Sequence, residues 1–151
     1  MCIRDSFLGG LFVVINGLEK SDILNTIATY LVNFTSNNVL LTIPLITMVC
    51  GSLSGLVDNI PITMLLIPLV RKSVELTGSK VLWWCLITGA GLGGNLTPLA
   101  SPSNVIAINV SKSEGHPIEL GEFIKTGTLV ALIHLFVSIL YLSLLNVLGV
   151  F

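Results

Sequence analysis

The pattern along this chain is one of long apolar runs separated by short polar segments. Three runs carry no charged residue, and they cover residues 23–57, 81–111 and 126–151. Each exceeds the ~20 apolar residues that a helix needs to cross a bilayer. The pattern therefore predicts an all-α polytopic membrane protein.

The first part of the chain, residues 7–35, predicts the end of a scaffold helix followed by an interfacial helix. The apolar stretch at 7–17 is too short to span a bilayer, and the polar segment LEKSD (18–22) closes it with an aqueous turn. In the next helix, apolar residues recur at a spacing that places them on one side. They are Ile23, Ile27, Tyr30, Leu31 and Phe34. A short amphipathic helix of this kind suits the membrane interface better than the bilayer centre.

Residues 1–6, MCIRDS, make an unusual start. They lack the charged and then apolar pattern of a signal peptide, and they resemble the translated adapter sequence found at the ends of metagenomic assemblies. We expect a non-native leader here and leave it out of the fold prediction. We also expect the chain to be the C-terminal portion of a longer protein.

A polar interruption, VDNIPIT at 57–63, divides the next apolar region into two arms. The arm before it has 19 residues of helical character (39–57), and the apolar arm after it has 11 (60–70). At 1.5 Å per residue the second arm reaches only about 16 Å, which cannot cross a ~30 Å core. We therefore predict a re-entrant helical hairpin over 36–79, whose tip is buried in protein or lines a wet cavity.

The stretch at 80–112 predicts a transmembrane helix with a break inside it. The break, GLGGNLTPLASPSN at 91–104, contains three glycines, two prolines and several hydroxyl groups. A hydrophilic loop follows, and residues 120–151 predict a final transmembrane helix that is long enough to be tilted. The motif GSLSG (51–55) fits G-x-x-x-G, which is typical of closely packed helices.

Composition supports the membrane prediction and excludes other classes. Charged residues make up 10% of the chain and the mean hydropathy is +0.96, whereas soluble domains carry roughly 25% charged residues. The net charge is −1 and the cations are scattered, so we expect the lipid bilayer as a partner and no nucleic acid. The cysteines follow no metal or disulfide spacing. They are Cys2, Cys50 and Cys85.

Asp58 is the most informative single residue, because a charge within a membrane segment costs at least ~2.5 to 3.5 kcal/mol. One interpretation is a carboxylate in a water-exposed loop. The other is an ion-binding site formed by Asp58, Asn59 and Thr63, with Na⁺ at Asp58 and Asn59, since oxygen ligands suit hard cations. Thr63 is equally explained by a hydroxyl that satisfies backbone carbonyls freed by Pro61.

A second group of polar side chains lies in the break. An aqueous loop would explain them, but the apolar sequences on both sides favour a substrate-binding role. The predicted substrate-binding residues are Asn95, Thr97, Ser101, Ser103 and Asn104.

Enzymatic and nucleotide-binding functions find little support. GAGLGG (89–94) satisfies G-x-G-x-x-G, but Pro98 and Pro102 follow closely and no βαβ unit surrounds it. His134 lies in the final span and His116 in a loop, and no Ser/His/Asp or metal-spaced cluster converges. We predict no enzyme and no cofactor other than a coupling ion, Na⁺ or H⁺.

Two polar breaks, one in a hairpin and one in a discontinuous helix, are typical of secondary transporters. The sequence SLSGLVDNIPITMLLIPLV, followed by LWWCLITGAGLGGNLTPLASPSNVIA and GEFIKTG, resembles the C-terminal half of the ion transporter superfamily. It is most similar to the citrate-transporter-like group, which holds arsenite permeases, bacterial sodium/proton antiporters and the melanosomal P protein. The resemblance implies the second inverted repeat of an elevator-type carrier, a homodimer when complete, in a prokaryotic inner or plasma membrane.

The resemblance leaves the substrate open. Asp58 stands where the related divalent-anion symporters have a neutral residue, which favours cation or proton coupling over direct anion binding. Sodium/proton antiport, arsenite or anion permeation, and citrate or dicarboxylate symport remain the alternatives within transport. A polytopic membrane protein with a structural or partner-binding role is the alternative outside it.

Overall fold

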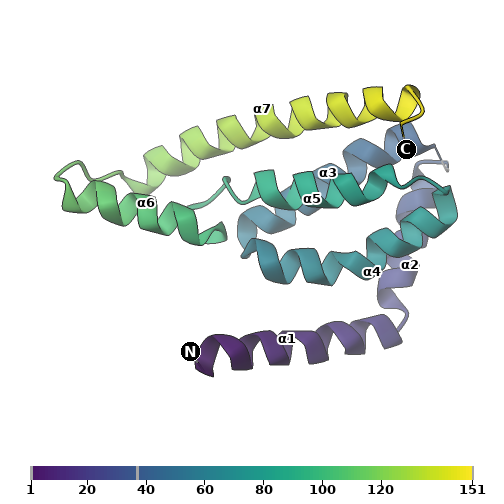
Figure 1. The fold of residues 1–151 in the computed structure, drawn as a ribbon, viewed down its shortest axis with the longest axis horizontal. Coiled ribbons are helices and arrows are strands. Elements are labelled where there is room, and N and C mark those ends of the chain that lie inside the picture. Colours follow the sequence, from purple (N-terminus) through teal and green to yellow (C-terminus); the bar gives the residue numbers. More distant parts are fainter. Residues whose placement is uncertain (1, 37, 151) are drawn as a thin grey trace.

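The computed structural model describes residues 2–36 and 38–150 of the chain, and within them every regular element is a helix. Seven α-helices and one 3₁₀-helix follow one another in sequence (Figure 1). They are α1 (Cys2–Lys20), α2 (Ile23–Phe34), α3 (Val39–Leu56), α4 (Asn59–Thr77), α5 (Val81–Gly93), η1 (Pro98–Ala100), α6 (Pro102–Ser113) and α7 (Leu120–Val147). The all-α prediction is confirmed.

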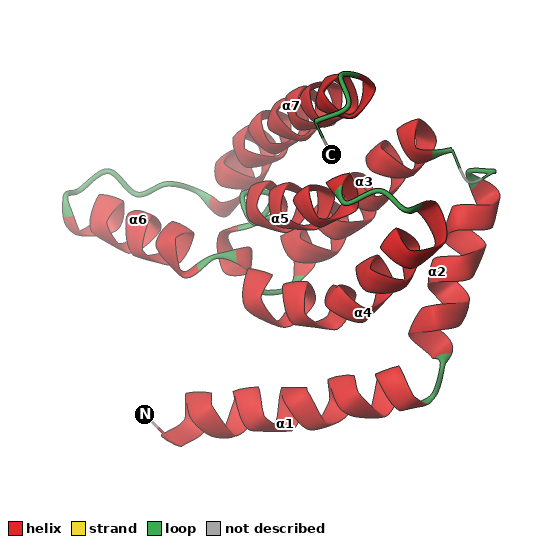
Figure 2. Cartoon of the chain, turned by 45° about the vertical axis from the view of Figure 1, so that its right-hand side comes forward, coloured by secondary structure: helices red, strands yellow, loops and turns green. Residues whose placement is uncertain are grey.

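Four helices, α3, α4, α5 and α7, run along the long axis of the molecule and pack side by side (Figures 1 and 2). Of the described helices, α3 and α7 are long and apolar enough to cross a membrane. Helix α7 has 28 residues, which at 1.5 Å per residue gives about 42 Å. It extends past the α3–α4 turn toward α6 (Figure 1).

Helix α4 is longer than the 11 apolar residues of the predicted second arm. It has 19 residues, because the helix continues through Arg71 and Lys72 to Thr77 and ends at Gly78 in a left-handed conformation. Its length is therefore about 28 Å, close to the thickness of a bilayer core. The helix is longer than the apolar run because basic residues ended the run without ending the helix. Helix α4 is not among the described helices that are both long and apolar enough to cross a membrane, so the re-entrant hairpin stays a prediction.

Helix α2 crosses the long axis of the bundle (Figures 1 and 2). One stripe of it is buried, at Leu24, Ala28 and Val32, and this stripe packs on α4. Tyr30 and Phe34 lie on another stripe and are 72% and 82% exposed. The crosswise direction and the exposed aromatic side chains suit the predicted interfacial helix, which stays a prediction.

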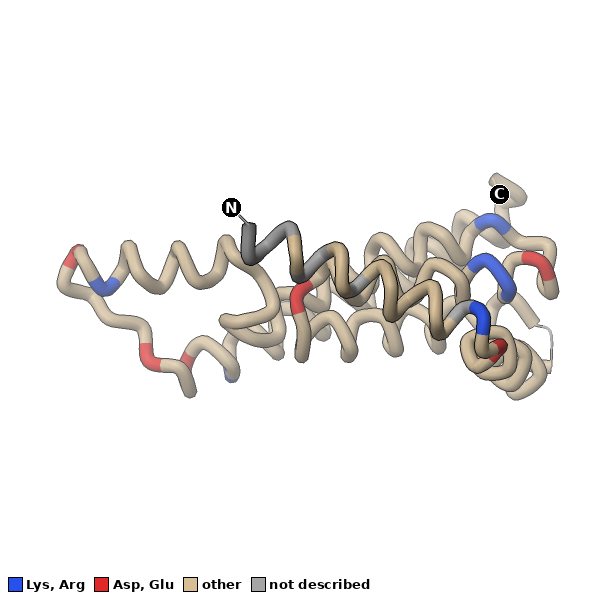
Figure 3. Tube along the Cα trace, turned by 90° about the horizontal axis from the view of Figure 1, so that it is seen from below, with Lys and Arg blue, Asp and Glu red and all other residues tan. Residues whose placement is uncertain are grey.

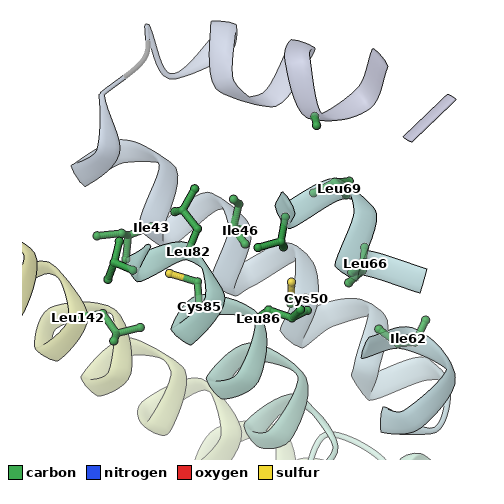
Figure 4. Packing of buried hydrophobic residues seen from close by; sticks show 13 residues of the cluster. Ile43, Ile46, Cys50, Ile62, Leu66, Leu69, Leu82, Cys85, Leu86 and Leu142 are labelled. Carbon is green, nitrogen blue, oxygen red and sulfur yellow. The ribbon is translucent and has the colours of Figure 1, made fainter. Parts of the chain in front are cut away.

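The hydrophobic core lies between α3, α4, α5 and α7, and Figure 4 shows its side chains from close by. Ile43 and Ile46 of α3 face Leu82 and Leu86 of α5, and all four are at most 2% exposed. Helices α3 and α5 approach so closely that a Cβ on Gly93 would lie 2.6 Å from the Gly51 Cα. Backbone contact of this kind is typical of small residues at membrane helix interfaces.

Charged side chains gather toward the two ends of the long axis (Figure 3). The α4–α5 region supplies one group, including Arg71, Lys72 and Lys80, and the loop between α6 and α7 supplies the other. Asp58 belongs to neither group in the sequence, because it lies in the turn between α3 and α4. This distribution fits a molecule whose middle lies in the bilayer and whose ends lie in water.

Candidate functional site

The turn between α3 and α4 and the break after α5 meet at one place in the fold. Thr97 donates a hydrogen bond from Oγ1 to the Gly55 carbonyl, with a distance of 2.7 Å. Gly55 also lies against Leu96, whose Cβ would be 2.8 Å from a Cβ at position 55. The two polar interruptions in the sequence are therefore in direct contact.

A second contact joins the start of α4 to the end of α5. The Asn59 side chain lies so close to Gly94 that an added Cβ at 94 would sit 2.6 Å from Asn59 Oδ1. The residue at 94 must therefore lack a side chain for Asn59 to hold its position. Gly94 is buried, so this contact lies inside the protein.

Asn104, in the first turn of α6, joins the start of that helix to the backbone of the break. Its Nδ2 donates to the Gly94 carbonyl at 3.0 Å and to the Thr97 carbonyl at 3.2 Å. Two backbone acceptors in the break thereby obtain a donor, as buried carbonyls require. The Asn104 amide nitrogen is committed to the backbone, whereas its Oδ1 makes no hydrogen bond to the described residues.

Four helix ends converge on this region. Helices α3 and α5 end here, at Leu56 and Gly93, and helices α4 and α6 begin here, at Asn59 and Pro102. Carbonyl groups at helix C-termini carry partial negative charge, and N–H groups at helix N-termini carry partial positive charge. The arrangement can therefore stabilise a cation at one pair of ends and an anion at the other.

Ser54 is the most constrained polar side chain at the site. It is fully buried, and its Oγ lies 2.5 Å from Asn59 Oδ1 and 2.6 Å from the Ala90 carbonyl oxygen. One hydroxyl proton cannot serve two oxygen acceptors at once. Either the Asn59 amide turns to donate from Nδ2, or a cation compensates the three close oxygens.

The sequence analysis placed Ser54 only within the packing motif GSLSG, and therefore missed its role. The glycines of that motif do pack closely, Gly51 on Leu135 and Gly55 on Leu96. The serine that lies between them faces the contact region instead. A signal was present, because Ser54 is a polar residue in an apolar arm and lies three residues before the polar interruption that begins at Val57.

The predicted ion-binding residues at the tip differ in their contacts. Asn59 faces Ser54 and Gly94, whereas the carboxylate of the half-buried Asp58 makes no hydrogen bond or ion pair with any described residue. Asp58 precedes α4 but does not cap it through its side chain. Thr63 donates to the Asn59 carbonyl at 2.7 Å, which is the backbone-satisfying role that the sequence left open.

Pro61 occupies the third position of α4. The first N–H groups of a helix have no partner within it, so a proline there removes no intrahelical hydrogen bond. The expectation that Pro61 frees backbone carbonyls is wrong for this reason. The turn itself is made by extended backbone at Val57 and Asp58.

The predicted substrate residues of the break also separate into groups. Thr97 and Asn104 face the contact region, while Ser101 and Ser103 bond to one another through their hydroxyl oxygens at 2.7 Å. Asn95 is exposed and lines a pocket against α7. The substrate-binding role of all five stays a prediction.

Acidic and metal-ligating side chains do not cluster in the described part of the chain. No group of three His, Cys, Asp or Glu residues there could hold a metal ion. A cation at this site would be bound by neutral oxygens of hydroxyl, amide and carbonyl groups, which suits Na⁺ rather than a transition metal. His134 lies elsewhere on α7, with Nδ1 2.9 Å from the Val130 carbonyl oxygen of its own helix.

Long apolar helices and polar interruptions that meet inside the bundle define an integral membrane protein of the transporter class. Comparison with known proteins identifies the group within that class. The model of the citrate transporter family matches residues 6–149. The chain therefore belongs to the citrate transporter family of the ion transporter superfamily, which confirms the resemblance seen in the sequence.

Several curated proteins are similar over most of this chain. A 46 kDa membrane protein of Mycobacterium leprae is 34% identical over 142 residues, which cover 91% of this chain and 33% of the relative. An uncharacterized transporter of Synechocystis is 28% identical over 155 residues, 91% of this chain and 34% of the relative. The P protein of Mus musculus is 30% identical over 109 residues, 70% of this chain and 13% of the relative.

The chain spans about a third of the length of the first of these relatives. No solved structure matches it.

Proposed function

We propose that this chain forms the ion-binding part of a cation-coupled secondary active transporter in a prokaryotic plasma membrane. The observation that carries the proposal is the Ser54 hydroxyl, buried between Asn59 Oδ1 and the Ala90 carbonyl oxygen. When Asn59 Oδ1 faces Ser54, the three oxygens share one hydroxyl proton, and a small cation such as Na⁺ bound beside them would supply the missing positive charge. The turned amide, which donates from Nδ2, is the arrangement expected without the cation. The C-termini of α3 and α5 add favourable partial charge.

The transported substrate is a small ion, and the helix N-termini supply the place for an anionic one. Helices α4 and α6 both begin at the contact region, and free N–H groups at helix starts bind anions. The name of the citrate transporter family supports a carboxylate substrate. Cation and anion would then bind side by side without either carrying an unpaired charge.

Asp58 has a separate role in this proposal. Its carboxylate lies outside the Ser54–Asn59 contact and has no partner among the described residues. A carboxylate in that position attracts a second cation, whose charge offsets the repulsion between Asp58 and an anion at the start of α4. Asp58 therefore couples the movement of the substrate to that of a cation.

The transport movement that we propose is of the elevator type, with this chain as one of two inverted repeats. The hairpin turn and the helix break contact each other beside Gly127, partway along α7. A site at this depth, reached by a hairpin from one end and a broken helix from the other, suits alternating access. Purified complete protein that runs as a monomer would contradict the homodimer that the resemblance implies.

The ion site is tested by Ser54→Ala in the complete transporter that contains this segment, reconstituted in proteoliposomes. We expect the Na⁺ concentration for half-maximal transport to rise about tenfold, which corresponds to ~1.4 kcal/mol of lost ion binding. Protein amount and orientation are matched by immunoblotting and protease accessibility.

Ser73→Ala is the matched control, because Ser73 is also buried but donates only to the Leu69 carbonyl of its own helix. It removes the same hydroxyl group without touching the site. Equal sodium dependence in the two variants would contradict the ion site. Transport that is absent from the unmodified protein under every cation gradient would favour a structural or partner-binding role.

A further inference from the structure

A pocket of about 390 Å³ lies between the break and the first turns of α7, apart from the Ser54–Asn59 contact. Asn95 of the break forms one wall, and Glu122 and Thr126 of α7 lie across from it. Ile118, Phe123 and Val130 supply apolar surface. This volume is in the range of small-molecule sites, which are typically 300–1,000 Å³.

The pocket depends on a close approach of the backbone. A Cβ on Gly127 would lie 2.5 Å from the Asn95 carbonyl oxygen, so the break rests directly on α7 at this glycine. Glu122 and Thr126 are four residues apart on a helix and share one face. The contact at Gly127 thus holds Asn95 next to this pair.

The polar side chains of the pocket are available to a ligand. The side chains of Asn95, Glu122 and Thr126 make no hydrogen bond or ion pair with the described residues. Three such groups next to apolar surface match a molecule with a polar head and an apolar body.

The charge of the pocket determines whether the polar head of the ligand should be a cation or an anion. Glu122 is the ionisable residue among those that line it, so a cation is favoured and an anion is repelled. Phe123 adds an aromatic ring that can attract a cation over its face. One carboxylate on a largely apolar wall does not replace the water shell of an inorganic ion, whereas an organic ammonium keeps a smaller shell and brings its own apolar surface.

We propose that this pocket binds an amphipathic organic ammonium, whose charged head pairs with Glu122 and bonds to Asn95 and Thr126 and whose apolar body contacts Phe123 and Val130. The pocket shares Asn95 with the predicted substrate-binding residues, but it does not include Ser54 or Asn59, so the proposal does not depend on the ion site. Both a soluble amine and an aminophospholipid head group carry this chemistry.

The test measures binding of n-hexylammonium to the purified complete transporter by isothermal titration calorimetry, with hexan-1-ol and hexanoate as probes of equal length. We expect saturable binding of the ammonium, at least about tenfold weaker binding of the alcohol, and no binding of the carboxylate. Glu122→Gln should weaken ammonium binding about tenfold, since it removes the charge and keeps the shape. Glu114→Gln, in the loop outside the pocket, should leave it unchanged.

Equal affinities for ammonium and alcohol, an unaffected Glu122→Gln variant, or no saturable ammonium binding would each overturn the proposal. Nanodiscs distinguish the two sources of the head group. Phosphatidylethanolamine and phosphatidylcholine are both zwitterionic, but the trimethylammonium group of phosphatidylcholine has no N–H to donate to Asn95 or Thr126. If phosphatidylethanolamine in place of phosphatidylcholine weakens hexylammonium binding, the lipid occupies the pocket; if binding is unchanged, a soluble amine is the ligand.

Discussion

Thr97 donates its hydroxyl proton to the Gly55 carbonyl across 2.7 Å, and this bond ties the helix break to the C-terminal turn of α3. The two residues are 42 positions apart in the sequence. Gly55 lies in the last turn of α3, where carbonyls lack partners within the helix. The bond therefore satisfies a helix end and fixes the break against the hairpin at once.

Replacing Thr97 by Val should separate the break from the hairpin, because the Gly55 carbonyl then loses its donor. An acceptor left without a partner costs about 1–3 kcal/mol. The measurement is the apparent melting temperature of the purified complete protein in detergent. Thr88→Val is the control, because Thr88 bonds to carbonyls of its own helix; the idea fails if both variants melt alike.

Replacing Gly94 by Ala should weaken ion binding more than it weakens the fold. The new methyl group would lie 2.6 Å from Asn59 Oδ1, so the Asn59 amide must turn away from Ser54. We expect the Na⁺ concentration for half-maximal transport to rise about tenfold. Gly91→Ala makes the same change where nothing lies within 4 Å, and a matching rise there would count against a specific effect at Asn59.

Replacing Gly93 by Ala should loosen the pair of helices α3 and α5. The added Cβ would lie 2.6 Å from the Gly51 Cα, and backbone cannot move aside as a flexible side chain does. Overpacking of this kind typically costs about 1–3 kcal/mol. Melting temperature and detergent resistance measure the loss, and unchanged values for both would show that α3 and α5 are not held at this distance.

Replacing Asp58 by Asn should lower ion-dependent transport at normal expression, while the Na⁺ affinity of the Ser54–Asn59 site changes little. The reason is that the Asp58 carboxylate makes no hydrogen bond to Ser54 or Asn59. Flux is measured in proteoliposomes with imposed Na⁺ and pH gradients. Asp22→Asn, in the exposed turn before α2, is the control. Unchanged ion-dependent flux in Asp58→Asn would rule out a role for this residue in coupling.

Much of the fold was predictable because it depends on local properties of the chain. Apolar runs of sufficient length must form helices in a bilayer, since every backbone polar group there needs a partner within the segment. The interruptions at 57–63 and 91–104 contain the residues that end α3 and α5. The length of α4 was missed because Arg71 and Lys72 end the apolar run while remaining good helix formers.

The candidate site was predictable only in part. The sequence brought Asn59, Thr97 and Asn104 to attention, because polar residues in apolar runs stand out. It could not show that Ser54 contacts Asn59 or that the Asp58 carboxylate makes no hydrogen bond to the described residues. These contacts depend on how α3, α4 and α5 pack against one another.

The sequence by itself determined that this chain is a helical membrane protein with two polar breaks, and its motifs determined the family. Only the tertiary structure decided which polar groups meet: the hydroxyl of Ser54 with the amide of Asn59, and the hydroxyl of Thr97 with the carbonyl of Gly55. The physical reason is that the two properties depend on different distances along the chain. Hydropathy is a property of neighbouring residues and can be read from the sequence. The pairing of donors and acceptors joins residues far apart in the sequence, and it depends on how closely the glycines of α3 and α5 let the two backbones approach.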